Sequence, residues 1–402
     1  MKILIVSPYF YPENFRVSDF AFRMVARGHE VTVLTGLPNY PNGKFFGKFR
    51  IFRREIIDGV KIYRVPIIPR MEGTKIGLFF NYLSFLVSGL LFGPILLCRE
   101  KPDVIFSVNY SPPTASLIGL LLTKFLKAPM YTWVQDLWPE SLSATGSVKV
   151  NFVIEVIEKI MLVVYSGSSI VLVQSKAFAE VIKSKGVDEE KIQYFPNWAE
   201  DIYSLDQSSQ DRFRDLIPTD KFIIMFAGNL GVAQSLDTII KAANLTKGSL
   251  IHWVFLGDGR KSEWLCNAIA EYALEDSVSV LGRYPVEDMP AFFNLADAML
   301  VTLKTDPAFG MTIPGKIQSY LKSGKPILSA LDGEGALVIK ESGSGFNANS
   351  GDFNGLAENA IKMSEMTSLE LSAMGACGQR FYLQNFDAEY LFSKFESFGD
   401  LR

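Results

Sequence analysis

Two stretches of this chain decide its fold: Phe226–Gly231 (Phe-Ala-Gly-Asn-Leu-Gly) and Val6–Glu13 (Val-Ser-Pro-Tyr-Phe-Tyr-Pro-Glu). Each follows a short apolar run that is typical of a buried parallel strand, and each precedes a segment whose apolar residues have helical spacing. A strand that ends in small or polar residues before a helix is the repeating unit of ligand-binding parallel sheets. Two such units, far apart in the chain, predict two doubly wound α/β domains that face a central cleft.

Strands and helices alternate in both halves of the chain, which predicts mostly parallel sheets. The expected strands are 3–6, 31–35, 104–108, 130–134 and 170–173, with a hairpin over 50–65, and then 222–227, 252–256, 278–281, 298–302 and 326–329. Residues 199–220 lose apolar periodicity and are expected to be a linker. The predicted domains are 1–198 and 221–385, followed by a helical segment, 386–402, that packs back on the first domain.

The bulk composition excludes several classes of protein. A chain of 402 residues is too long for one hydrophobic core, and a net charge of -3 argues against nucleic-acid binding. Three distant cysteines exclude a disulfide framework and a cysteine-rich zinc site, and fit a reducing compartment. Because the sequence also has only two histidines and no Asp-x-Asp triplet, we expect neither a metal nor a cofactor.

The segment Ile76–Cys98 contains no charged residue and is long enough to span a bilayer. Spanning would place strands of one predicted sheet on opposite sides of the membrane, so two alternatives stay open: a buried helix, or a helix seated in a membrane surface. The preceding segment, 41–75, carries nine basic and three acidic residues, interleaved with four phenylalanines. Basic and aromatic residues beside an apolar helix favour the anionic cytoplasmic leaflet.

Small residues after predicted strands of the second half indicate a phosphate site. Gly228, Asn229 and Gly231 would let backbone amides approach a phosphate, although an ordinary tight turn has the same pattern. Gly257 and Asp258 end a neighbouring strand and would line the same edge, unless they form a simple turn.

Lys316 is expected in the first turn of a helix that ends at Gly324. A cation is unfavourable at that end of a helix, so its presence points to an anionic ligand. The alternative is a solvated surface lysine.

Acidic residues of the first half indicate an acceptor site. Asp136 follows the strand 130–134 and could take a proton from an acceptor hydroxyl, while Trp138 could shape an apolar pocket beside it. The alternative for Asp136 is a helix cap or a salt bridge. Glu13 is the second catalytic candidate, and Arg16 is a candidate for contact with an acceptor phosphate.

The chain resembles the GT-B glycosyltransferases of family 4, which have two Rossmann-like domains, and more narrowly the bacterial O-antigen L-fucosamine (L-FucNAc) transferases. The resemblance is carried along nearly the full length by the motifs 7–13, 135–141, 195–198, 228–231, 256–259, 282–284 and 314–316. It implies that the loop of Arg283 and Tyr284 contacts a nucleotide base. It also implies a UDP-sugar donor, a polyprenyl-diphosphate-linked sugar acceptor and a cytoplasmic enzyme bound peripherally to the inner membrane, active in O-antigen or surface polysaccharide synthesis.

The sequence departs from this family at two places. Many members hold the diphosphate with an arginine and a lysine where Asn229 and Gln234 stand, and carry a glutamate pair where Met311 and Ser319 stand. Lys316 and backbone amides are therefore left as the expected phosphate partners. Two other functions stay open: a UDP-sugar 2-epimerase, which shares this two-domain build, and a non-catalytic nucleotide-sugar-binding scaffold.

Overall fold

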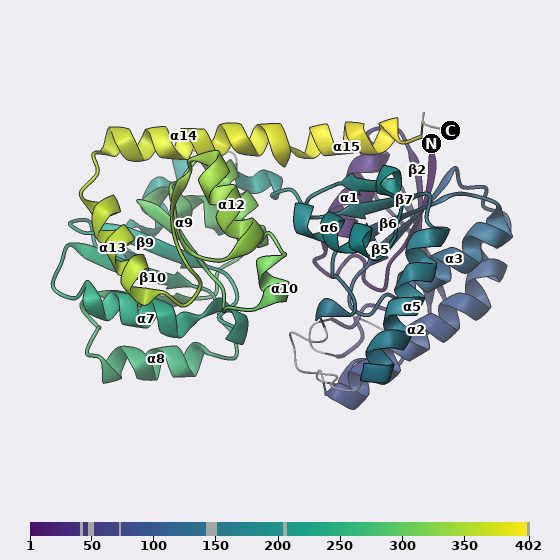
Figure 1. Ribbon diagram of the computed structural model, residues 1–402, viewed down its shortest axis with the longest axis horizontal. Helices are drawn as coiled ribbons and strands as arrows, with labels where there is room; N and C mark the ends of the chain where they lie inside the picture. Colours follow the sequence, from purple (N-terminus) through teal and green to yellow (C-terminus); the bar gives the residue numbers. More distant parts are fainter. Residues whose placement is uncertain (41–42, 47–51, 72–73, 142–150, 204–206, 400–402) are drawn as a thin grey trace. The chain divides into compact units, whose positions relative to one another are not determined.

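The structure, a computed structural model, describes residues 1–40, 43–46, 52–71, 74–141, 151–203 and 207–399 (Figure 1). The chain divides into two compact units, Met1–Phe195 and Pro196–Arg402. Each unit contains one sheet with helices on both faces, so the two predicted α/β domains are confirmed.

Unit 1 has an eight-stranded sheet in the order β3-β4-β2-β1-β5-β6-β7-β8. All neighbouring strands are parallel except the β3–β4 hairpin. The strands are β1 Lys2–Val6, β2 Glu30–Gly36, β3 Arg53–Ile57, β4 Val60–Val65, β5 Val104–Asn109, β6 Met130–Val134, β7 Ile170–Val173 and β8 Ile192–Tyr194. The helices are α1 Arg16–Ala26, α2 Lys75–Leu96, α3 Thr114–Leu126, α5 Asn151–Gly167 and α6 Lys176–Ser184, with a 3-10 turn, η2, at Glu189–Lys191.

Neighbouring residues of β5 show how the helices cover both faces of this sheet. Phe106 packs against Phe20 of α1, with ring centroids 4.6 Å apart, while Ser107 donates a hydrogen bond to Ser116 of α3 at 3.0 Å. Because successive side chains of a strand point to opposite faces, α1 and α3 lie on opposite sides of the sheet.

Helix α2 packs on the sheet and on α3 along one side only. A Cβ atom at Gly89 would lie 2.3 Å from Ile118 Cδ1 of α3, so the Ile118 side chain packs directly against the backbone of α2 there. The opposite side of α2 is exposed, and only 28% of its apolar window is buried. This exposure excludes the alternative of a fully buried helix.

By length and composition, Ile76–Leu96 is the one helix among the described residues that could cross a membrane. The sheet excludes that topology, because β1 pairs with β2, which precedes α2 in the chain, and also with β5, which follows it. The two ends of α2 therefore lie on the same side of any membrane.

Unit 2 has a six-stranded parallel sheet in the order β11-β10-β9-β12-β13-β14. The strands are β9 Phe222–Ala227, β10 Ile251–Leu256, β11 Val278–Gly282, β12 Ala298–Thr302, β13 Ile327–Ala330 and β14 Gly345–Ala348. The helices are α7 Leu236–Leu245, α8 Ser262–Glu271, α9 Met289–Leu295, α10 Pro307–Gly310, α11 Gly315–Lys322, α12 Gly333–Ser342, α13 Phe353–Ser364, α14 Ser368–Asn385 and α15 Ala388–Ser397. Hydrophobic clusters cover both faces, since Met225 belongs to one and its neighbour Phe226 to the other.

The segment predicted to be a linker is largely part of unit 2. It contains 3-10 helices at Asp201–Tyr203 (η3) and Gln207–Leu216 (η4), and Phe213 stacks on Phe292 of α9 with ring centroids 4.2 Å apart. The stretch Gln207–Leu216 is mostly polar and lacks the apolar spacing that marks an amphipathic helix, so the sequence pattern did not reveal it. The hairpin strand expected from residue 50 begins at Arg53, and residues 50 and 51 lie outside the described residues.

Candidate active site

The carboxyl ends of the parallel strands in unit 2 bring together two of the glycine loops expected to hold a phosphate. The amide of Gly228, after β9, donates a hydrogen bond to Leu256 O of β10 at 2.8 Å. Gly257 has φ +138°, and a Cβ atom there would lie 1.9 Å from Gly228 O. Only glycine permits this close approach of the two loops.

Lys316 joins this edge from the first turn of α11. Its Nζ lies 3.3 Å from the centroid of the Phe226 ring, and its Cε would contact a Cβ atom on Gly228 at 2.8 Å. The Nζ atom is buried and has no hydrogen-bond partner among the residues that the structure describes. Burial lowers the pKa of the Lys316 ammonium well below its usual value. These facts exclude the alternative of a solvated surface lysine.

Asp258 forms local bonds in the loop after β10. Its Oδ1 accepts hydrogen bonds from Ser262 Oγ and from the Gly259 amide, both at 2.7 Å, and these bonds lower the pKa of its carboxyl. Arg283 also lowers that pKa through its charge, so its guanidinium lies near the same loop. Asp258 thus shapes the loop, while the exposed Arg283 is available at its rim.

Three other donor candidates have partners inside unit 2. The Gly231 amide donates to Gln234 Oε1 at 3.1 Å, so it is not open to a phosphate in this structure. The Asn229 side chain fills the space between Gly231 and Gly259. Tyr284 packs edge-on against Phe213 and Phe292 in the core.

In unit 1, Asp136 lies at the carboxyl edge of the sheet as expected. Its Oδ2 accepts a hydrogen bond from the Ser111 amide at 2.9 Å, and Trp138 Nε1 donates to Ser111 Oγ at 2.6 Å. These bonds fix the loop after β6 against the loop after β5. Among the described residues Asp136 has no ion-pair partner, so the salt-bridge alternative is not observed there.

Tyr110, which follows β5, lies within the electrostatic influence of both Arg16 and Asp136. Burial raises the pKa of the Tyr110 phenol above its usual value, the negative charge of Asp136 raises it further, and the positive charge of Arg16 lowers it. Both charges therefore act on one phenol. We did not predict Tyr110 or Ser111, although their place directly after a predicted strand is the same signal that identified Asp136.

Glu13 is buried and holds two loops together. Its Oε1 accepts hydrogen bonds from the amides of Asn39 and Tyr40, both at 2.8 Å, and its Oε2 accepts one from the Phe10 amide at 3.2 Å. Burial raises the pKa of the carboxyl, and the three amides oppose that rise. With its oxygens occupied by backbone donors, Glu13 has the geometry of a positioning residue rather than of an exposed base.

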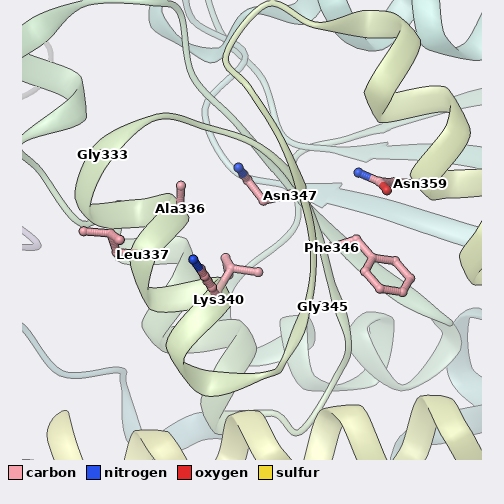
Figure 2. Close-up of a pocket in the computed structure, with 9 residues that line it drawn as sticks. Gly333, Ala336, Leu337, Lys340, Gly345, Phe346, Asn347 and Asn359 are labelled. Atoms are coloured by element: carbon pink, nitrogen blue, oxygen red, sulfur yellow. The ribbon is translucent and has the colours of Figure 1, made fainter.

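A cavity of about 520 Å³ lies elsewhere in unit 2, between α12, β14 and α13 (Figure 2). Asn347 contributes to its wall, but the amide of that side chain is already bonded: its oxygen accepts from Ser329 Oγ and the Leu331 amide, and its nitrogen donates to Leu331 O. No residue singled out from the sequence lines this cavity.

Comparison with known families identifies the two units as glycosyltransferase domains. Residues 14–198 match the family described as "Glycosyl transferase 4-like domain", and residues 207–374 match "Glycosyl transferases group 1". The protein is a glycosyltransferase. The two matches cover most of unit 1 and most of unit 2, including the loops of Asp136, Gly228 and Lys316.

Individual relatives agree with this assignment. The glycosyltransferase is 27% identical over 318 residues to a Pseudomonas aeruginosa protein named as the glycosyltransferase WbjE, with 77% of each chain covered. It is 26% identical over 346 residues to an Escherichia coli K12 protein named for colanic acid biosynthesis, the glycosyl transferase WcaI, with 81% and 82% covered. The structure of HepE from Anabaena with UDP and glucose matches over 100% of both chains at 15% identity and a TM-score of 0.69. This likeness shows that the fold is GT-B.

Proposed function

We propose that this glycosyltransferase moves a deoxyamino sugar, specifically L-FucNAc, from UDP onto a sugar carried by a polyprenyl diphosphate. Unit 2 would hold UDP and unit 1 the acceptor. The observation that carries the lipid-linked acceptor is the exposed apolar side of α2, in the same unit as Asp136. The names of the relatives, which include colanic acid and amylovoran biosynthesis, support a role in O-antigen or surface polysaccharide synthesis.

In the proposed reaction the bond between the sugar's anomeric carbon and the UDP oxygen breaks, and the acceptor oxygen forms the new bond. UDP leaves with the electron pair, and the acceptor proton passes to the Asp136 carboxylate. Lys316 stabilises the charge that develops on the leaving diphosphate. Arg283 at the rim of the same loop is then next to the nucleotide.

The exposed apolar surface of unit 1 extends over three helices, which favours a membrane-bound location. Helices α2 and α3 pack together, as do α3 and α5, and all three are visible in unit 1 (Figure 1). We call the set of exposed apolar side chains the apolar face; it contains Ile76, Phe79, Phe80, Leu83, Val87, Leu91 and Ile95 of α2, Leu121 and Phe125 of α3, and Phe152, Val153, Val156 and Val163 of α5. An exposed apolar surface of this size marks a site that binds a protein partner or a membrane. Because the proposed acceptor is anchored in a membrane by its lipid, we favour the membrane.

Fewer basic residues of segment 41–75 are available for membrane binding than their number implies, because some are paired within unit 1. Arg64 is buried and pairs with Glu55, which also pairs with Arg53 at 2.8 Å. Arg54 and Lys44 are exposed and remain available to anionic lipids. We therefore propose peripheral attachment to the cytoplasmic face of the inner membrane, mainly through the apolar face and partly through these charges.

A donor screen tests the function. The enzyme is incubated with UDP-L-FucNAc, UDP-GlcNAc and UDP-glucose, each with a lipid-linked GlcNAc acceptor, and the lipid product is read by mass. We expect the lipid to gain one deoxyamino sugar, and NMR of its anomeric proton then gives the stereochemistry. Gain of glucose instead would replace the donor assignment, and no gain with any donor would contradict the acceptor.

A further inference from the structure

Arg70, in the loop between β4 and α2, has a guanidinium group with no counter-ion among the residues that the structure describes. Its Nη1 donates a hydrogen bond to Tyr9 OH at 3.2 Å, and its buried Nε has no partner among the described residues. No carboxylate in the described part of the chain pairs with it. Burial raises the pKa of the Tyr9 phenol above its usual value, so this partner is neutral and does not balance the charge.

Arg64, in the same unit, does have a carboxylate partner, which sets Arg70 apart. Arg64 lies six residues earlier in the same unit, and each of its guanidinium nitrogens donates a hydrogen bond. Its Nε donates to Glu55, its Nη1 to Gly36 O and its Nη2 to Tyr11 O. A half-buried arginine usually has such partners, because an unpaired charge away from water is unfavourable. Within the described part of the chain, Arg70 is thus a cation without a neutralising partner, held in place before any ligand binds.

Aromatic rings hold the guanidinium of Arg70 in a fixed orientation. Its Cζ lies 4.9 Å from the centroid of the Tyr40 ring and 5.7 Å from that of Tyr9, within the range of cation–π attraction. The Arg70 amide donates to Asn39 Oδ1 at 3.1 Å. The side chain is therefore preorganised, and an anion bound by it would not have to order it first.

The position of Arg70 links two features of the proposed function. The Tyr9 ring also lies 6.0 Å from the ring of Tyr110, whose phenol lies near Asp136. On the other side, the Tyr9 hydroxyl meets that of Tyr82, on α2, at 3.4 Å. Arg70 thus lies where the acceptor edge of the sheet meets the helix that carries the apolar face.

We propose that Arg70 binds the diphosphate of the lipid-linked acceptor, with the sugar toward Asp136 and the polyprenyl chain along α2. The planar guanidinium offers parallel N–H donors that match phosphate oxygens. Arg16 is then left beside the acceptor sugar. This inference rests on the proposed function, and it names the group that recognises the anionic part of that acceptor.

The experiment compares two acceptors that differ only in the diphosphate: a sugar on farnesyl diphosphate, and the same sugar on a plain farnesyl ether. In detergent, Arg70→Met should raise KM for the diphosphate acceptor about ten- to hundred-fold and leave KM for the ether acceptor nearly unchanged. Arg70→Lys, which keeps the charge but loses the fork, should fall between the two. Arg212→Met is the matched control, because Arg212 also stacks on a ring, that of Phe213, but is paired with Asp288.

A second readout needs no turnover of the diphosphate acceptor. Farnesyl diphosphate should inhibit the wild-type reaction with the ether acceptor, and Arg70→Met should weaken that inhibition about ten-fold or more, while farnesol acts equally on both proteins. Equal losses with both acceptors and unchanged inhibition would show that Arg70 only holds Tyr9 and α2 together, and would overturn the inference.

The membrane is the other source of phosphate. If Arg70→Met weakens binding to phosphatidylglycerol vesicles but leaves the ratio between the two acceptors unchanged, the arginine binds lipid headgroups, and the inference is overturned. If the wild-type enzyme glycosylates neither acceptor, it is the proposed function that fails, and farnesyl diphosphate binding by calorimetry still decides whether Arg70 holds a diphosphate.

Discussion

Lys316 Nζ lies 3.3 Å from the centroid of the Phe226 ring, at the end of the strand that leads into Gly228. The ring face attracts a cation and offsets part of its lost hydration, but it cannot accept hydrogen bonds as a phosphate oxygen does. The Lys316 amine therefore has hydrogen-bonding capacity that its described neighbours do not satisfy, and a bound diphosphate would satisfy it.

Replacement of Lys316 by alanine should weaken UDP binding and leave the fold intact. Loss of a charge-assisted hydrogen bond of about 1.5–3 kcal/mol corresponds to about ten- to hundred-fold in affinity. Lys241→Ala is the control, since Lys241 also lies over a ring, that of Phe353, at 5.4 Å. Calorimetry measures both, and an unchanged UDP affinity in Lys316→Ala would remove this residue from the site.

Binding of UDP should draw a proton onto Lys316. Because burial lowers the pKa of this group in the free protein, its amine is partly or wholly uncharged above that lowered pKa, and the diphosphate restores the charge. Titrations in two buffers of different ionisation enthalpy, at a series of pH values up to the ordinary lysine pKa, should show uptake of a proton above the lowered pKa. Lys316→Arg should show none, since arginine stays protonated. Equal proton uptake in both proteins would assign the proton to another group.

The lowered pKa of Lys316 also determines in which direction the stability of the protein changes with pH. The unfolded chain binds a proton on Lys316 up to its usual pKa, whereas the folded protein loses it at a lower pH, so the unfolded state binds more protons between the two values. The free energy of unfolding should therefore rise with pH in this window, and Lys316→Met should flatten the rise in urea melts. A wild-type curve with no such rise would mean that the amine stays charged in the fold.

Asp136→Asn should lower turnover about 10²–10⁴-fold and leave UDP affinity nearly unchanged, because it keeps the shape of the side chain and removes the base. The Ser111 amide can still donate to the asparagine oxygen, so the loop should keep its structure. Single-turnover rates with saturating acceptor check this. Near-normal turnover in Asp136→Asn would end its assignment as the base.

Glu13→Gln should act mainly on stability. A glutamine offers one oxygen where the carboxylate accepts from three amides, so at least one buried amide loses its partner, at a cost of about 1–3 kcal/mol. Urea unfolding of the whole enzyme measures this. If stability stays normal while turnover is lost and Asp136→Asn remains active, the roles of the two carboxylates must be exchanged.

The apolar face should control membrane binding. Replacement of Phe79 and Leu91, each 60% exposed, by glutamine removes apolar contacts worth about 1.5–3 kcal/mol per fully buried side chain, so vesicle binding should fall about ten-fold or more. Leu369→Gln is the control, because Leu369 is 81% exposed but lies in unit 2. High salt should release only part of the wild-type protein. Full release by salt, with no effect of the glutamines, would assign the binding to charge alone.

Much of the fold was predictable because parallel strands buried on both faces are nearly continuous apolar runs. Strands such as Val104–Asn109 and Ile251–Leu256 stand out for this reason. Strand β14 (Gly-Phe-Asn-Ala) does not, since only its pairing with β13 makes it a strand: a Cβ atom at Gly345 would lie 1.7 Å from Ile327 O. Tertiary contact, rather than local preference, determines such an element.

The candidate site was predictable to the extent that it depends on strand ends. Asp136, Gly228 and Gly257 follow strands, and the structure places each at a carboxyl edge. Contacts between residues distant in sequence carry no such pattern. The ring of Phe226 beside Lys316, the three amides at Glu13 and the rings of Tyr9 and Tyr40 around Arg70 appear only when the chain is folded.

The central claim is sugar transfer from UDP to a lipid-linked acceptor, and acceptor-dependent UDP release tests it most directly. With UDP-L-FucNAc and lipid-linked GlcNAc, we predict that one UDP appears for each sugar added to the lipid, and that almost none appears when the acceptor is omitted. Conversion of the UDP-sugar to its epimer without acceptor, or no UDP release under either condition, would contradict the account.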